Sequence, residues 1–224
     1  MKYGQIAGNN SINAMIYHCF RYICEEDKRK FVKKFHEQPQ DSDQIMHTFR
    51  ELVLGAYLSS KGFKVRHDYM IGNQTPDWTI LDDEGKSVTG IVELTNFHID
   101  RATENEIEKQ MSAKGFAGYW RDQNKDNVER LYQVISAKVS AYRSLVKELQ
   151  VPYVVSLFGE FKAIVDFKEV RSCLFDEKTG LFGIYPELSG VLYFNDGYFF
   201  NYASNPNTLQ MIEVPDGTFT TEAT

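Results

Sequence analysis

Two acidic residues in a segment suited to β-structure are the first candidates for chemistry. In TPDWTILDDEGKSVTGIVELTNF, residues 75 to 97, Asp77 directly precedes an apolar run and Glu93 lies inside the apolar run IVEL. A buried carboxylate is costly unless a cation or a metal ion meets it. Strands at 78–81 and 88–95, joined by the turn DDEG, would form a hairpin that brings Asp77 close to Glu93. Two carboxylates at one edge of a sheet repel each other unless a cation lies between them.

Such a pair of carboxylates is typical of a magnesium or manganese site. Hard oxygen ligands with room for waters suit Mg²⁺ or Mn²⁺. Side chains alternate along a strand, so Glu93 and Thr95 share a face opposite to Leu94. We expect the backbone carbonyl of Leu94 or Thr95 to assist the two carboxylates. A metal ion held in this way can activate water and stabilise the extra charge on a phosphate during hydrolysis.

Three motifs in chain order resemble the PD-(D/E)XK nuclease superfamily, which has the restriction-endonuclease-like fold. They are FRELVLGAYLSSKGFKV, TPDW and IVELT. Glu51 corresponds to the glutamate on the preceding helix, Pro76-Asp77 to the PD, and Glu93-Leu94-Thr95 to the ExK position, here a variant ExT. The resemblance covers roughly residues 43 to 158, about half of the chain. It implies a Mg²⁺-dependent endonuclease that hydrolyses phosphodiester bonds in DNA, with metal at Asp77, Glu93 and Leu94 and with Glu51 supporting the metal or its water.

The resemblance also implies a lysine that positions or activates the attacking water, and Thr95 takes its place in the motif. Members of the superfamily vary at this position, and some supply a lysine from elsewhere in the fold. The helix expected at 126–149 carries an apolar stripe with a 3.6-residue period. Lys138 lies roughly 45° from the centre of that stripe, so it borders the packed face. We therefore hypothesise that Lys138 reaches back towards Glu93 and Thr95 and orients the nucleophile.

Each candidate also has a purely structural interpretation. Lys138 could cover apolar surface with its stem, and Glu51 could be a solvated helix residue. Asp77 could belong to a turn after proline, Glu93 could be an edge carboxylate paired with lysine or arginine, and Thr95 is a common strand residue. The three histidines nearest these motifs show no metal-binding spacing: His47, His67 and His98.

The pattern around these residues predicts an α/β protein with a mixed central sheet flanked by helices. We expect a single domain over 1–224: an N-terminal helical extension at 10–38, a core at 43–158 with a helical insertion at 98–126, a C-terminal helix and β-hairpin within 159–214, and a frayed tail at 215–224. The expected helices are 10–38, 43–61, 102–114, 126–149 and 161–175. The expected strands are 63–71, 78–81, 88–95, 153–158 and the two arms of a hairpin at 190–202. The basic run KRKFVKK, residues 28 to 34, indicates a solvated helix end.

Composition is typical of a globular protein and excludes several other classes. Hydrophobic residues make up 42% and the net charge is −6, so any surface for DNA would have to be local. Basic and aromatic residues near the insertion are the candidates: Lys109, Lys114, Tyr119, Trp120, Arg121, Lys125 and Arg130. The three cysteines fit no zinc pattern and indicate reduced thiols. Since no apolar run is long enough for a membrane span, we expect a soluble, cytoplasmic protein.

A second interpretation comes from a different functional class. The missing ExK lysine and the net acidity favour a catalytically inactive nuclease-fold module, which would serve as a nucleic-acid-binding or protein-assembly scaffold. In either case, the C-terminal half, rich in phenylalanine and tyrosine, could mediate a homodimer.

Overall fold

The fold is built around one seven-stranded sheet whose spatial order follows the order of the chain. The computed structural model describes residues 9–37, 42–98, 101–115, 123–160, 163 and 165–221. The strands are β1 (Lys64–His67), β2 (Trp78–Leu81), β3 (Val88–Phe97), β4 (Tyr153–Gly159), β5 (Gly190–Asn195), β6 (Phe199–Ser204) and β7 (Gly217–Thr218). The three central strands β3, β4 and β5 run parallel, and the remaining pairs are antiparallel. The predicted mixed sheet and the C-terminal hairpin are therefore confirmed.

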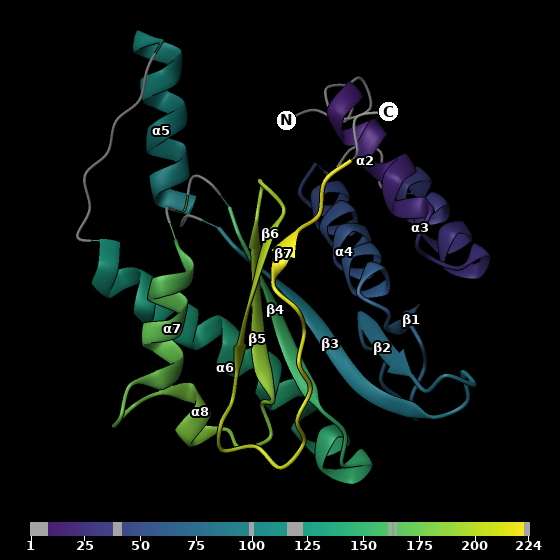
Figure 1. Cartoon of the computed structure of the whole chain (residues 1–224). Helices are drawn as coiled ribbons and strands as arrows, with labels where there is room; N and C mark the ends of the chain where they lie inside the picture. The colour runs from purple at the N-terminus through teal and green to yellow at the C-terminus, as the bar shows by residue number, and fades with distance from the viewer. Residues whose placement is uncertain are drawn as a thin grey trace.

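Helices cover both faces of the sheet (Figure 1). One side carries α2 (Asn10–Phe20), α3 (Glu25–Glu37) and α4 (Ser42–Ser60). The other carries α6 (Gln123–Leu149), α7 (Phe167–Phe175) and the short α8 (Leu181–Ile184), while α5 (Arg101–Lys114) projects beyond the sheet. Alternating strand residues fill two separate apolar cores: Val92 and Leu94 pack on the α4 side, whereas Ile91 and Val155 pack on the α6 side. No described helix combines the length and apolar character that crossing a lipid bilayer requires.

The single helix expected at 10–38 is wrong, because the chain turns between α2 and α3. Arg21 and Tyr22 close the first helix with hydrogen bonds to the carbonyls of His18 and Cys19. The second helix then starts with three acidic residues, Glu25, Glu26 and Asp27. Acidic side chains stabilise a helix N-terminus, so EED marks a new start within a continuous apolar pattern.

Two further expectations are corrected at strand ends. The strand expected at 63–71 stops at His67, since Asp68 adopts a positive φ of 46° that no regular strand contains. The tail expected to fray from residue 215 instead forms β7, which pairs with β6, and Phe219 is buried beside it. Residues 222–224 lie outside the described part. A two-residue strand carries too little periodicity to be predicted.

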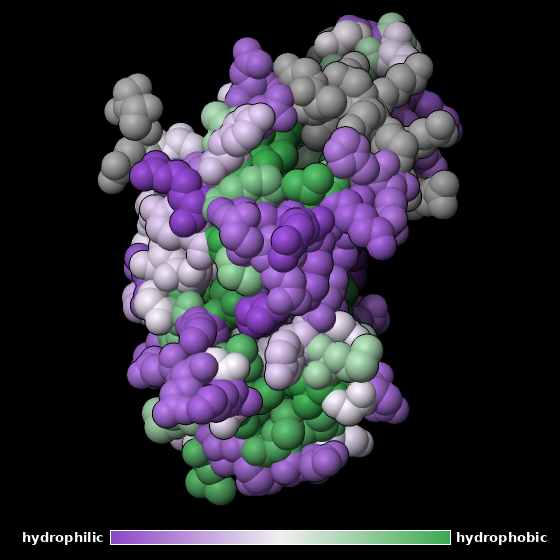
Figure 2. Space-filling view, turned by 90° about the vertical axis from the view of Figure 1, so that its right-hand side faces the viewer, coloured by the Kyte–Doolittle hydropathy of each residue, from purple (hydrophilic) through white to green (hydrophobic). Residues whose placement is uncertain are grey.

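The basic run of α3 is only partly solvated. Hydrophilic residues cover much of the side of the molecule that faces the viewer in Figure 2. On α3, Lys33 is exposed and pairs with Glu37. Lys30 and Lys34 instead turn towards the sheet. Lys30 Nζ donates to the His67 carbonyl at 2.5 Å, and Lys34 Nζ lies 3.2 Å from the Glu51 carboxylate. The expected solvated helix end is therefore wrong for these two lysines.

Candidate active site on the third strand

Asp77 and Glu93 lie side by side at the point where β3 extends past the first residue of its neighbour β2. The register pairs Trp78 with Val92, so the residue before β2 comes opposite Glu93. The backbone N–H of Asp77 donates to Glu93 Oε1 at 2.8 Å, and the N–H of Leu94 donates to Asp77 Oδ2 at 2.7 Å. The Asp77 carboxylate thus replaces the missing strand partner of Leu94. In an extended strand the N–H and C=O of one residue point to the same side, so the Leu94 carbonyl shares this edge.

Lys138 of α6 completes the group. Its Nζ lies 2.8 Å from Glu93 Oε2 and 3.6 Å from Asp77 Oδ2. The hydroxyl of Tyr153 on β4 donates to the Lys138 carbonyl at 3.0 Å, which fixes this turn of the helix on the sheet. The predicted proximity of Lys138 and Glu93 is confirmed, and its role in catalysis stays a prediction. We call Asp77, Glu93 and Lys138 the carboxylate–lysine group.

Burial controls the protonation of this group. Glu93 is 1% exposed, and burial followed by the Asp77 charge raises its pKa to about 7, although Lys138 acts in the opposite direction. Burial also raises the pKa of Asp77, helped by Glu51 and opposed by Lys138. For Lys138, burial is outweighed by the two carboxylates, which raise its pKa. When both acids are ionised and Lys138 is protonated, the three side chains together carry one net negative charge.

Two tyrosines stand next to the carboxylates. Tyr142 on α6 donates a hydrogen bond from its hydroxyl to the Thr75 carbonyl at 3.3 Å and stacks on Tyr153 with ring centroids 6.0 Å apart. Burial, followed by the charge of Glu93, raises the pKa of both tyrosines. Thr95 lies on the same face of β3 as Glu93 and is half-buried.

Glu51 belongs to a second, adjacent group rather than to this one. Its carboxylate lies 3.2 Å from Lys34 Nζ, 3.1 Å from His47 Nε2 and 3.2 Å from His67 Nε2. Burial favours the protonated form, but the hydrogen bonds from His47 and His67 and the charge of Lys34 hold the pKa of Glu51 well below its usual range. Glu51 influences Asp77 through its charge. Among the described residues, no hydrogen bond joins Glu51 to Asp77 or Glu93.

The partners of Glu51 are Lys34, His47 and His67, which lie on α3, α4 and β1. None of them was predicted from the sequence to contact Glu51. His47 is one helical turn before Glu51, a spacing at which side chains meet, and this was the one local signal. Lys34 and the fully buried His67 arrive from α3 and β1 through tertiary packing. Asp68 adds a further carboxylate 3.0 Å from Lys34 Nζ. Spacing rules for metal-binding histidines could not reveal histidines that bind a carboxylate.

The carboxylate–lysine group offers the donors that a magnesium or manganese ion takes. The described residues hold no set of three or more His, Cys, Asp or Glu side chains arranged around a metal position. Mg²⁺ nevertheless keeps several waters and is commonly bound by one or two carboxylates, so Asp77, Glu93 and the Leu94 carbonyl are a sufficient donor set. The residual negative charge favours a cation, whereas the Lys138 ammonium competes with it. This edge therefore fits a hydrated divalent ion and not a closed, all-protein cage.

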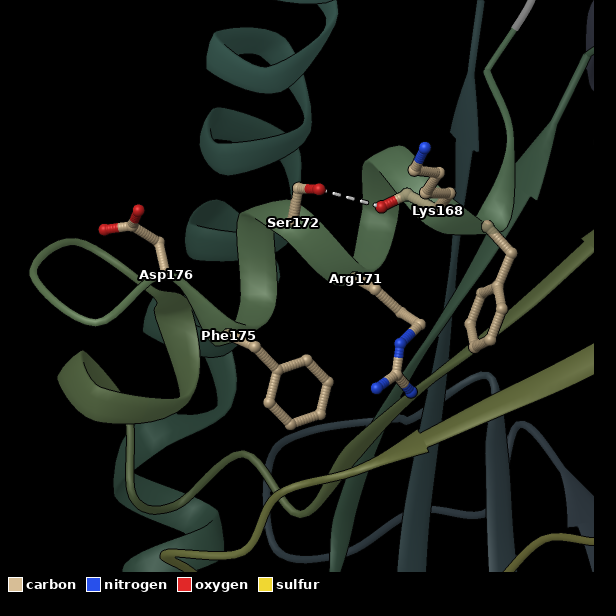
Figure 3. Close-up of a pocket in the computed structure, with 6 residues that line it drawn as sticks. Lys168, Arg171, Ser172, Phe175 and Asp176 are labelled. Atoms are coloured by element: carbon tan, nitrogen blue, oxygen red, sulfur yellow. Dashed lines mark hydrogen bonds between the residues drawn. The ribbon is translucent and has the colours of Figure 1, made fainter.

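The residues expected to contact a phosphate backbone are distributed over several surfaces. Lys109 and Lys114 are exposed on α5. Arg130 instead stacks on Phe97, 4.7 Å from the ring centroid, and donates to the His98 carbonyl, so it is occupied within the protein. Tyr119, Trp120, Arg121 and the side chain of Lys125 lie outside the described residues. A shallow hollow on α7 adds two exposed basic residues, Lys168 and Arg171 (Figure 3).

Comparison with known proteins finds no matching family, no similar characterised protein and no similar solved structure.

Proposed function

We propose that this protein is a metal-dependent phosphodiesterase that acts on DNA, as the resemblance to the PD-(D/E)XK nuclease superfamily implies. The observation that supports this most is the approach of Lys138 to Glu93 and Asp77. A lysine from α6 stands beside the two carboxylates, where the motif itself supplies only Thr95. Two carboxylates and a strand carbonyl at one sheet edge can hold a divalent metal ion, which would supply the chemistry for hydrolysis of a phosphate diester, and the ammonium beside them can donate to the attacking water.

In this proposal, Asp77, Glu93 and the Leu94 carbonyl would hold Mg²⁺ or Mn²⁺, which would lower the pKa of a bound water and stabilise charge on the phosphate. Lys138 keeps its proton because two carboxylates face it. Its ammonium can therefore donate hydrogen bonds to the attacking water or to a phosphate oxygen. Glu93 and Asp77 hold Lys138 in place. Glu51 tunes Asp77 electrostatically from the adjacent group.

The test is cleavage of DNA in the presence of Mg²⁺ or Mn²⁺, with charge-matched controls. Asp77→Asn, Glu93→Gln and Lys138→Met should each lower the rate by about 100-fold or more, since each removes a preorganised charge. Glu84→Gln and Lys147→Met change exposed residues of the same types and should cleave like the wild type. Equal cleavage by Glu93→Gln and Glu84→Gln over linear, nicked and single-stranded substrates contradicts the proposal.

The alternative is a catalytically inactive nuclease-fold module that acts as a nucleic-acid-binding or protein-assembly scaffold. The observation in its favour is that both carboxylates already have structural partners: Lys138 neutralises Glu93, and Leu94 binds Asp77. Calorimetry separates the two functions. An enzyme should bind Mn²⁺ in a manner that Asp77→Asn abolishes, whereas a scaffold should show no such binding.

The oligomeric state remains a separate prediction. Nucleases of this fold that make paired cuts use two copies, and the aromatic C-terminal half exposes Phe199 at 55% and Leu209 at 94%. A homodimer would sediment at about twice the monomer mass. Sedimentation velocity of the purified chain measures this directly.

A further inference from the structure

The outer side of α7 carries a shallow hollow that the proposed hydrolysis does not use (Figure 3). Its lining residues all belong to this helix or follow it directly: Phe167, Lys168, Arg171, Ser172, Phe175 and Asp176. They form two rows with a spacing of four residues, which places them on one side of the helix. Small-molecule pockets enclose most of the surface of their ligand. A hollow formed by one helix cannot do so, and it instead suits a ligand that lies across the surface.

Two planar groups of this hollow are stacked on each other and remain open to solvent. Arg171 and Phe175 project from the same side of α7 (Figure 3), and the guanidinium carbon lies 4.7 Å from the centroid of the phenylalanine ring. Phe175 is 39% exposed, and the buried Phe182 meets its ring edge-on, with centroids 5.0 Å apart. Phe182 therefore supports Phe175 in a fixed orientation at the surface. Aromatic rings and guanidinium planes are the surfaces on which unpaired nucleic-acid bases stack.

The two basic residues of the hollow are available to an anion. Lys168 and Arg171 are exposed, and within the described part of the chain no salt bridge joins either of them to a carboxylate. The acidic residues that flank them along the helix, Asp166, Glu169 and Asp176, accept hydrogen bonds from backbone N–H groups at the two ends of α7. Two unpaired cations beside a stacking surface match the alternation of phosphate and base in a nucleic-acid strand.

The stacking surface favours a single strand over a duplex. In a duplex the neighbouring base pairs cover both faces of each base, and a protein reaches only the base edges and the phosphates. A ring such as Phe175 can therefore meet a base face only where the strand is unpaired. Since every base has a π-face, we expect little dependence on sequence.

We propose that this side of α7 binds single-stranded nucleic acid, with a base stacked on Arg171 and Phe175 and a phosphate bound by Lys168. The surface lies on the α6 side of the sheet, the side that also carries Lys138 (Figure 1). It is separate from the carboxylate–lysine group, and binding there needs neither a metal ion nor hydrolysis.

The experiment measures binding of a short fluorescein-labelled oligothymidylate to the full chain by fluorescence anisotropy, in a chelator and at several salt concentrations. The wild type should bind this strand saturably and about tenfold or more tightly than its duplex with oligoadenylate. Phe175→Leu should weaken binding by about tenfold and keep the salt dependence, because it removes a stacking ring and no charge. Lys168→Gln should instead lower the slope of log affinity against log salt by about 0.7, the value for one phosphate of a single strand.

Matched controls change residues of the same types elsewhere on the surface. Phe199→Leu alters a ring that is 55% exposed on β6, and Lys147→Gln alters an exposed lysine on α6. Both should bind the strand like the wild type and with the same salt slope. Phe175→Tyr keeps a ring and should also bind like the wild type. If Phe175→Leu does not fold, Arg171→Gln replaces it and should lower both the affinity and the slope.

Oligouridylate as a second ligand distinguishes RNA from DNA, since the tighter of the two single strands names the ligand. The proposal is overturned if the wild type binds neither strand saturably, if the duplex binds as tightly as the single strand, or if Phe175→Leu and Phe199→Leu bind equally well.

Asp77→Asn separates this proposal from the proposed hydrolysis. It should bind the single strand like the wild type and lose cleavage in Mn²⁺. Normal binding by Phe175→Leu together with loss of cleavage in Asp77→Asn contradicts only the α7 surface. Weakened binding by Phe175→Leu together with unchanged cleavage in Asp77→Asn contradicts only the hydrolysis.

Discussion

At the scale of single residues, the carboxylate–lysine group shows how three charges can share a largely buried site. Lys138 offsets the repulsion between Asp77 and Glu93, and the N–H of Leu94 offsets part of the cost of burying Asp77. Removing one member of such a group leaves its partners unpaired in a medium of low polarity. The loss is usually larger than the net contribution of the intact group.

Lys138→Met should lower the free energy of unfolding by about 1–3 kcal/mol at neutral pH without metal, because it leaves two adjacent carboxylates without their counterion. Mn²⁺ should restore most of this stability if the two carboxylates bind metal. Denaturant unfolding with and without Mn²⁺ measures both effects. The control Lys147→Met, on the exposed side of α6, should change stability by less than about 0.5 kcal/mol. A loss of equal size in the two variants would show that Lys138 is a solvated side chain.

Glu93 should give the metal-free protein a distinct pH dependence. Its pKa is about 7 in the folded state against an ordinary 4.5, so between these values the folded chain binds more protons than the unfolded chain. The free energy of unfolding should therefore fall by about 1–3 kcal/mol as pH rises from 4.5 to 7. Glu93→Gln should remove this decrease, and Glu84→Gln should keep it. Unfolding titrations in a chelator at several pH values test the prediction, which fails if the two variants follow the same curve.

At the scale of elements, the close approach of α4 to β2 sets the position of Trp78. This residue is the first of β2 and directly follows Asp77. Trp78 is fully buried, and its indole N–H donates to the Glu51 carbonyl at 2.8 Å. Gly55 of α4 permits this contact, since a Cβ at that position would lie 1.9 Å from the indole ring. The contact between Gly55 and Trp78 thus brings α4 close to the hairpin that carries the carboxylates.

Gly55→Ala should destabilise the protein by about 2–4 kcal/mol, because the clash with Trp78 outweighs the gain of about 1 kcal/mol in helix propensity. Gly183→Ala in α8 is the matched control, since a Cβ there meets nothing within 4 Å. That change should be neutral or slightly stabilising. Thermal unfolding with fluorescence of the two tryptophans reports on both variants. Equal melting temperatures for the two would contradict the close packing of α4 on β2.

Periodicity explains which elements of the site could be predicted. The apolar stripe of α6 is regular over its length, so the side of the helix that carries Lys138 could be predicted. The alternation of residues along β3 likewise predicted the face of the sheet on which Glu93 lies. The environment of Glu51 could not be inferred, because Lys34 and His67 reach it from α3 and β1 by tertiary packing. The break between α2 and α3 was missed because apolar residues continue through it. Its signal was the acidic start of α3.

At the scale of the whole molecule, the C-terminal segment joins the N-terminal helices to the sheet. The ring of Phe219 lies 4.9 Å from that of His18 and 5.5 Å from that of Tyr22, measured between centroids, and β7 extends the sheet beside β6. The hydroxyl of Tyr57 on α4 donates to the Pro215 carbonyl. The last described residues therefore contribute to the α4 core and are not a dispensable tail.

Phe219→Ala should cost about 2–4 kcal/mol, as expected for removing a buried aromatic side chain. Leu209→Ala changes a side chain that is 94% exposed and should stay within about 0.5 kcal/mol of the wild type. Urea unfolding followed by circular dichroism measures both. If Phe219→Ala is as stable as Leu209→Ala, the C-terminal segment does not pack as described.

The correspondence between strand order and chain order has a consequence for biosynthesis. Each strand pairs with the one made just before it, so the sheet can grow by addition at one edge while the chain leaves the ribosome. The hairpin of β2 and β3 would place Asp77 next to Glu93 before α6 has been made. During that interval the two acids have no lysine beside them, and the later arrival of Lys138 balances one of their two negative charges. Docking of α6 is thus the step of synthesis at which this edge of the sheet becomes electrostatically stable.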